Sequence, residues 1–208
     1  LAQAIDRLSS EQFGVSSLTL MENAGSSVAE IIRQRESQER TIVVLAGAGN
    51  NGGDGLVVAA LLHEWGYKVR VIGVAEPYAR PTEARVRQWA RCKAHKIVQE
   101  QPFTGVADGA VIVDAVLGLG LRGGLGPGNI RTILETASRA HGITVYALDV
   151  PSGMDTDTGD EQNIPLRPDV TITFGGAKPC HILDPSRSRC GEVIVIDIGF
   201  PEEAVAAA

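Results

Sequence analysis

The stretch AGAGNNGGDGL, residues Ala46–Leu56, decides the fold, because five of its eleven residues are glycines and apolar segments lie on both sides of it. The run TIVVLA at 41–46 is typical of a strand buried in a parallel sheet. The residues DGLVVAALLHEWG at 54–66 predict a helix that ends at Gly66, with Asp54 as its N-cap. A strand, a glycine turn and a helix in this order begin an α/β unit.

The same alternation of strand and helix continues along the chain. We expect strands at 41–46, 68–74, 110–116, 143–150, 169–176 and 192–199, and helices at 3–13, 17–35, 54–66, 81–95 and 129–142. Repeated strand–helix–strand units predict a mostly parallel, doubly wound sheet with helices on both faces. A helical N-terminal arm precedes the sheet. With no linker or repeat in view, residues 1–208 are expected to form a single domain.

Composition excludes several classes of partner. The net charge of −6 argues against a broad surface for nucleic acid or anionic membrane. No apolar run approaches the roughly 20 residues of a membrane span, and no secretory signal is evident. The three cysteines form no CxxC pair and the four histidines are scattered. We therefore expect no zinc site, and a reducing, cytoplasmic environment.

The glycine stretch has two readings. Gly47, Gly49 and Gly52 match the G-x-G-x-x-G pattern of dinucleotide-binding turns, and Glu76 follows the second strand where a ribose partner would stand. Asp54 argues against this reading, because a carboxylate at the start of the helix competes with a phosphate for the same N–H groups. A hydride-transfer site and a plain glycine turn with a capping aspartate both stay open.

Acidic residues at other strand ends point to a shared site. Asp114 and Asp149 each come at the carboxyl end of a predicted strand, and Ser152 follows closely. Strand ends of a doubly wound sheet converge on one crevice, so these residues are expected to meet Asn51 and Asp54 there. Amide, carboxylate and hydroxyl oxygens suit a hard cation. A carboxylate outside the cation's coordination shell is a candidate acid/base, and Asp149 is the best placed.

A second glycine-rich loop, at 117–124, could donate backbone N–H groups to a ligand. Arg122 in this loop is either a phosphate contact or an exposed surface charge. Lys178, after the strand VTITF, has the same two readings.

These motifs together resemble the NAD(P)H-hydrate epimerase family, also called the YjeF N-terminal domain. The resemblance is carried by AGAGNNGGDGLVVAALLHEWGYKVRV, VIVDAVLGLGLRGG, YALDVPSGMDTDTG and VTITFGGAKP in that order, and it extends from about Ile5 to Pro201. It implies a three-layer α/β/α, Rossmann-like fold. It also implies a potassium ion held by Asn51, Asp114 and Ser152, with Asp149 as the catalytic acid/base. The substrate contacts that it implies are Asn50, Asn51, Gly52, Gly53, Asp54, Gly118, Leu119, Gly120, Leu121, Arg122, Gly123, Gly124 and Asp149.

The activity implied by the resemblance is the interconversion of the R and S epimers of NADH and NADPH hydrated at C6 of the nicotinamide ring. The implied partners are the substrate, a dehydratase that consumes one epimer, and a second copy of the chain in a homodimer; nucleic acid and membrane are not expected. Two alternatives remain. One is an NAD(P)-dependent oxidoreductase, and the other is a binding module of the same fold without catalytic activity.

Overall fold

A parallel sheet forms the centre of the computed structural model, which describes residues 5, 12–74, 80–99, 102–118, 125, 127–155, 164–201 and 203–204. Its strands are β1 (Thr41–Ala46), β2 (Lys68–Gly73), β3 (Val111–Ala115), β4 (Thr144–Leu148), β5 (Val170–Phe174) and β6 (Glu192–Ile196). The helices are α2 (Ser17–Arg35), α3 (Asn50–Glu64), α4 (Glu83–Ala94), α5 (Asn129–Ala137) and α6 (Pro179–Ile182), with a short 3-10 turn, η1 (Ser186–Arg189).

The strand order β2-β1-β3-β4-β5-β6 is that of a doubly wound sheet, and every strand pair is parallel. The chain leaves β1 for β2 on one side and later returns to β3 on the other side. The point where the winding reverses therefore lies at the carboxyl ends of β1 and β3, and ligands of such sheets bind there.

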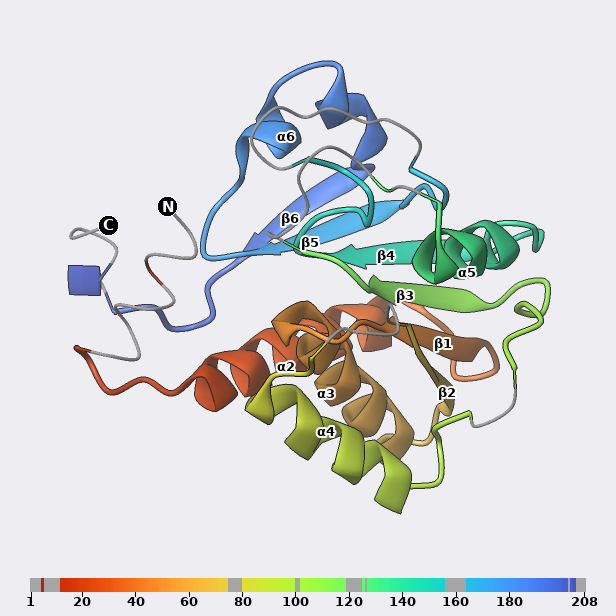
Figure 1. Ribbon diagram of the computed structural model, residues 1–208, viewed down its shortest axis with the longest axis horizontal. Helices are drawn as coiled ribbons and strands as arrows, with labels where there is room; N and C mark the ends of the chain where they lie inside the picture. Colours follow the sequence, from red (N-terminus) through yellow and green to blue (C-terminus); the bar gives the residue numbers. More distant parts are fainter. Residues whose placement is uncertain are drawn as a thin grey trace.

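Helices cover both faces of the sheet, which confirms the expected α/β/α layers (Figure 1). Alternate residues of β1 divide between two cores. Ile42 and Val44 pack with residues of α2, α3 and α4, whereas Val43 and Leu45 pack with residues of α5. Strands buried on both faces read as continuous apolar runs, which is the pattern that the sequence displays.

The helix α2 follows its sequence pattern closely. The Ser16 hydroxyl accepts the backbone N–H of Thr19, so a serine caps the helix. Most of the apolar face expected from the spacing is buried, with Leu18 and Ile31 half-buried, and Gly25 lets α2 approach α3. A Cβ at Gly25 would lie 2.4 Å from the Cβ of Val57, so a side chain there would separate the two helices.

The start of α3 differs from the prediction. The helix begins at Asn50, not after Asp54, and its N-cap is Gly49, which supplies no side-chain hydrogen bond. Asp54 therefore lies inside the helix, where it is 8% exposed, and it is not the cap. The two asparagines and two glycines that read as a loop are the first turn of the helix. The packing described below explains why.

One other expectation falls largely on residues that are not described: the short helix at 3–13, of which Ile5, Gln12 and Phe13 are described. None of the helices in the described ranges combines the length and the apolar composition needed to cross a membrane.

Candidate functional site

The segment that runs from the end of β1 into α3 has no room for side chains at Gly47, Gly52 and Gly55. A Cβ on Gly47 would lie 2.0 Å from the carbonyl oxygen of Val116, and one on Gly52 would lie 2.1 Å from the carbonyl oxygen of Gly47. A Cβ on Gly55 would lie 2.4 Å from the Cβ of Ala115. The glycines thus let the first turn of α3 rest directly on the end of β3, and this contact holds the N-N-G-G-D segment in helical form.

Gly118 lies between two residues of the predicted site. A Cβ at this position would lie 3.3 Å from the Cβ of Asn51 and 3.6 Å from Oδ2 of Asp149. The end of β3, the first turn of α3 and the end of β4 therefore meet around one glycine, as the sequence predicted for a shared site.

Asp114 and Ser152 form a buried hydrogen-bonded pair next to this point. The Ser152 hydroxyl donates to Oδ1 of Asp114 at 2.6 Å, and the Ser152 N–H donates to Oδ2 at 3.0 Å. The same hydroxyl accepts the N–H of Leu117 at 3.0 Å. Burial raises the pKa of the Asp114 carboxyl, and the bonds from Ser152 and Val116 oppose that rise.

Asn51 carries a polar group that the described residues leave unsatisfied. Both Oδ1 and Nδ2 of its amide are buried, and neither has a hydrogen-bond partner among the described residues. An unpaired buried amide costs about 1–3 kcal/mol, so its persistence in a packed site calls for an explanation. A ligand that accepts or donates at this amide would remove the cost.

Asp149 is held in an unusual backbone conformation by the strand beside it. Its φ is 65°, a left-handed value that is uncommon outside glycine, while its N–H donates to the carbonyl of Ile172 at 2.7 Å. One carboxylate oxygen, Oδ1, accepts from Thr173 at 3.1 Å and from Lys178 at 2.5 Å. No hydrogen bond from a described residue reaches the other oxygen, Oδ2, which faces Gly118.

Lys178 is neither a surface charge nor a contact for a ligand's anion, the two readings that the sequence left open. Its ammonium is buried and uses its three donors on Asp149 at 2.5 Å, on the Thr173 hydroxyl at 2.7 Å and on the Phe174 carbonyl at 3.0 Å. Thr173 was not predicted as a site residue, although a threonine inside the strand VTITF was a usable signal. Lys178 and Thr173 fix the orientation of the Asp149 carboxylate.

The remaining predicted residues are described only in part. Asn50 is exposed at the start of α3, while Gly52 and Gly53 are buried in its first turn. The predictions for Leu119–Gly124, including Arg122, fall outside the described residues, as does the one for Glu76.

The donor set fits a hard cation. Asn51 offers an amide oxygen without a partner among the described residues, and Asp114 offers a buried carboxylate that accepts hydrogen bonds but faces no cationic side chain in the described residues. Ser152 adds a hydroxyl oxygen. Oxygen donors without thiol or imidazole are what such cations prefer.

The cysteine thiols take no part in this chemistry. Cys92, Cys180 and Cys190 are buried and free, and burial raises the pKa of the Cys92 and Cys180 thiols to about 12. Thiols in this state are protonated at neutral pH and are poor nucleophiles.

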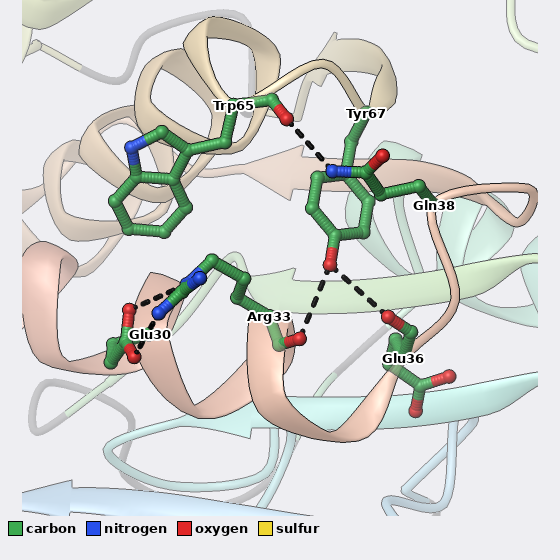
Figure 2. A pocket seen from close by; sticks show the side chains of 6 residues that line it. All are labelled: Glu30, Arg33, Glu36, Gln38, Trp65 and Tyr67. Carbon is green, nitrogen blue, oxygen red and sulfur yellow. Dashed lines mark hydrogen bonds and ion pairs between the residues drawn. The ribbon is translucent and has the colours of Figure 1, made fainter.

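A hollow of about 640 Å³ lies at the opposite edge of the sheet, before β1 and β2 (Figure 2). Figure 2 shows Arg33 held by Glu30 and Tyr67 reaching the backbone carbonyls of Arg33 and Glu36. Tyr146 likewise donates to the Glu36 carboxylate at 2.8 Å. The hydroxyls of these two tyrosines are hydrogen-bonded at the amino edge of the sheet, so neither lies in the site at the carboxyl edge.

Fold and site together define a class: a doubly wound α/β protein with an acidic, oxygen-rich ligand site at the point where the winding reverses. Comparison with known sequences narrows this class. The profile described as "YjeF-related protein N-terminus" matches residues 17–180, and the chain belongs to that family.

Two kinds of relative match the chain. It is 38% identical over 207 residues to the "Bifunctional NAD(P)H-hydrate repair enzyme Nnr" of Hyperthermus butylicus, covering 97% of this chain but 38% of that relative. It is 34% identical over 195 residues to the "NAD(P)H-hydrate epimerase" of Limosilactobacillus fermentum, covering 94% of this chain and 92% of that relative. The chain therefore spans well under half of the bifunctional protein and nearly all of the single-function one.

A solved structure has the same fold. The crystal structure of yeast ynu0, YNL200c, superposes with a TM-score of 0.72 at 26% identity, covering 99% of this chain and 89% of that chain.

His181, beside the Asp149–Lys178 pair, makes the stability of this region depend on pH. Its Nδ1 accepts the backbone N–H of Lys178 at 3.1 Å, and burial, aided by the charge of Lys178, lowers the pKa of the imidazole to about 4. The folded state therefore favours neutral His181. Its contribution to stability is complete above pH 6.5 and is lost as the pH falls from 6.5 towards 4.

We expect the free energy of unfolding to fall by up to about 3 kcal/mol between about pH 7 and pH 4 through this group. His181→Asn keeps an acceptor near the Lys178 N–H but removes the titration, so this part of the pH dependence should disappear. Urea unfolding at a series of pH values measures it. His141→Gln, at an exposed histidine, is the matched control. Identical pH dependence in wild type and His181→Asn would refute the assignment.

Proposed function

We propose that the chain is an NAD(P)H-hydrate epimerase, an isomerase that interconverts the R and S forms of C6-hydrated NADH and NADPH. Family membership and the single-function relative in Limosilactobacillus fermentum support this activity. The observation that carries it is the Asp149 carboxylate, whose Oδ1 is fixed by Lys178 and whose Oδ2 lies 3.6 Å from the place where a Cβ on Gly118 would stand. A fixed carboxylate whose second oxygen accepts no hydrogen bond from a described residue is suited to proton transfer at a bound hydroxyl.

The ion pair between Asp149 and Lys178 indicates which proton transfer comes first in the proposed epimerisation. The first hypothesis from the sequence is loss of water, in which Asp149 donates a proton to the C6 hydroxyl and later accepts it, and ring opening is the rival route. A carboxylate that accepts hydrogen bonds from both Lys178 and Thr173 starts the reaction as a proton acceptor. Oδ2 of Asp149 takes the proton of the C6 hydroxyl. This favours opening of the ring over loss of water.

The ring-opening sequence balances without any added reagent. As Asp149 takes the hydroxyl proton, the oxygen forms a double bond to C6 and the C6–N1 bond breaks. Its electron pair moves to N1 and is delocalised through the C2=C3 double bond onto the carboxamide. Rotation about C5–C6 exposes the other face of the aldehyde. N1 then attacks that face, and the new alkoxide recovers the proton from Asp149.

Oxygen labelling distinguishes this route from dehydration. In the ring-opening route the C6 oxygen never leaves, whereas loss and return of water exchanges it with solvent. We expect the epimer formed in H₂¹⁸O during one net conversion to retain unlabelled oxygen, measured by mass spectrometry of the product. Incorporation of ¹⁸O at the rate of epimerisation would establish the dehydration route instead.

The activity itself is tested with Asp149→Asn. We expect wild type to interconvert R- and S-NADPH hydrate, followed by chromatography, and Asp149→Asn to lose about 10²- to 10⁴-fold in rate because it cannot accept the proton. Asp108→Asn, at an exposed carboxylate, is the matched control.

Asp149→Asn also leaves Lys178 as a buried charge without its counter-ion, which could unfold the region. The double variant Asp149→Asn, Lys178→Met removes both charges and should fold while lacking activity. Epimerisation at the wild-type rate by either variant, or none by well-folded wild type, would overturn the proposal.

We further propose that Asn51, Asp114 and Ser152 hold a potassium ion. When bound, the ion would neutralise the buried Asp114 charge and present a positive centre to the polar groups of the substrate. The unpartnered Asn51 amide and the raised pKa of Asp114 support this assignment.

Potassium should stabilise the folded protein. At about ten times its dissociation constant the ion adds about 1.4 kcal/mol, or a rise of about 3–5 °C in Tm, relative to tetramethylammonium at equal ionic strength. Thermal unfolding measures this rise. Asn51→Ala should abolish it, whereas Asn50→Ala, at the exposed neighbouring asparagine, should retain it. An equal response of Tm to both salts in wild type would argue against the site.

The partners follow from the reaction class. An epimerase of hydrated cofactors supplies a dehydratase that accepts one epimer, and the fused relatives named as bifunctional repair enzymes support this pairing. A homodimer and a cytoplasmic location complete the proposal, and the free thiols support the location. The alternative, a module without catalytic activity, has no need of an aligned carboxylate such as Asp149.

A further inference from the structure

Arg85 lies in the first turn of α4, against the glycine turn that precedes α3. Its Nε donates to the carbonyl of Gly47 at 3.0 Å, and its guanidinium lies 4.4 Å from the ring centroid of Trp89. Its Cα is 3.5 Å from the place where a Cβ on Gly53 would stand. The side chain is thus fixed at the carboxyl edge of the sheet by a hydrogen bond and by stacking.

The charge of Arg85 has no anionic partner among the described residues, unlike those of its neighbours on the same helix. Arg87 pairs with Glu83 and Arg91 pairs with Glu64, both at 2.8 Å. Arg85 is only partly exposed, and burial lowers the pKa of its guanidinium. A partly desolvated cation held in one orientation without a counter-charge is suited to receive an anion.

Arg85 stands on the side of the crevice away from the acidic residues. Asp114 and Asp149 belong to β3 and the end of β4, on one side of β1, whereas Arg85 lies towards β2, on the other. Trp89 fixes this placement, because a Cβ on Gly73, the last residue of β2, would lie 2.9 Å from the edge of the indole ring. A dinucleotide in the crevice can therefore have its reacting ring near Asp149 and its phosphates near Arg85.

We propose that Arg85 binds a phosphate group of the dinucleotide substrate, an inference that rests on the proposed epimerase function. A guanidinium that stacks by one face on an indole keeps N–H donors at its edge, and these match two oxygens of one phosphate. The phosphate is either the pyrophosphate, present in both hydrated cofactors, or the 2′-phosphate, present only in hydrated NADPH.

The kinetic test replaces Arg85 by Met, which keeps an apolar stem against Trp89 and removes the charge. KM should rise about 10- to 100-fold while kcat stays within about twofold, because the lost contact is far from the reacting ring. Arg85→Lys keeps the charge and should restore part of the affinity. Arg87→Met, at an exposed arginine of the same helix, should behave as wild type.

Comparing hydrated NADH with hydrated NADPH as substrates shows which phosphate Arg85 binds. A rise in KM for both hydrates identifies the pyrophosphate, and a rise confined to hydrated NADPH identifies the 2′-phosphate. Either result supports the proposal. Unchanged KM for both substrates in Arg85→Met, with the Tm of wild type, would overturn it.

A binding measurement keeps the proposal independent of catalysis. Calorimetry with ADP-ribose and with its 2′-phosphate should show affinity in wild type and a loss of about 10-fold or more in Arg85→Met. If wild type binds these compounds but does not epimerise, the proposed function fails and the Arg85 site stands. If wild type epimerises and Arg85→Met binds equally well, the function stands and the Arg85 site fails.

Discussion

The close approach of backbone to backbone at the end of β1 is the constraint on which the site depends. Gly47 lies against the Val116 carbonyl and Gly52 lies against the Gly47 carbonyl, at distances that no side chain permits. Only this contact allows the first turn of α3 to rest on the end of β3. Without it, Asn51 could not lie beside Gly118, and the amide and the Asp149 carboxylate would face different regions of the crevice.

Electrostatics divides the same crevice into two halves. On the β3–β4 side, carboxylates are buried and compensated from within the protein: Asp114 by hydrogen bonds and Asp149 by the Lys178 ammonium. On the β2 side, Arg85 carries a positive charge with no counter-charge in the described residues. Breaking the buried ion pair of Asp149 and Lys178 would cost several kcal/mol, so the acidic half is rigid. In the basic half, the counter-charge for Arg85 would come from a bound ligand.

The sequence predicted correctly those features that depend on residues close together in the chain. The bounds of α2 and β1, Ser17–Arg35 and Thr41–Ala46, match the prediction. The placement of Asp149 and Asn51 near Gly118 followed from strand ends that share one edge. The start of α3 was wrong, because paired glycines disfavour a helix in isolation and only tertiary contact holds them in one. The ion pair of Lys178 with Asp149 was not predicted, since 29 residues separate them. The helix α6, which follows Lys178 directly, is only four residues long, too short to show a helical pattern of apolar residues in the sequence.

The left-handed backbone of Asp149 has a consequence for how this sequence can change. A non-glycine residue in that region carries a conformational cost of about 1–3 kcal/mol, which aspartate tolerates better than most. A procedure that selects residues only for agreement with the backbone would place glycine or asparagine at 149 and would remove the carboxylate. At position 149, backbone stability therefore favours glycine or asparagine, whereas the proposed catalysis requires aspartate. Stabilised designs on this scaffold need to hold residue 149 fixed.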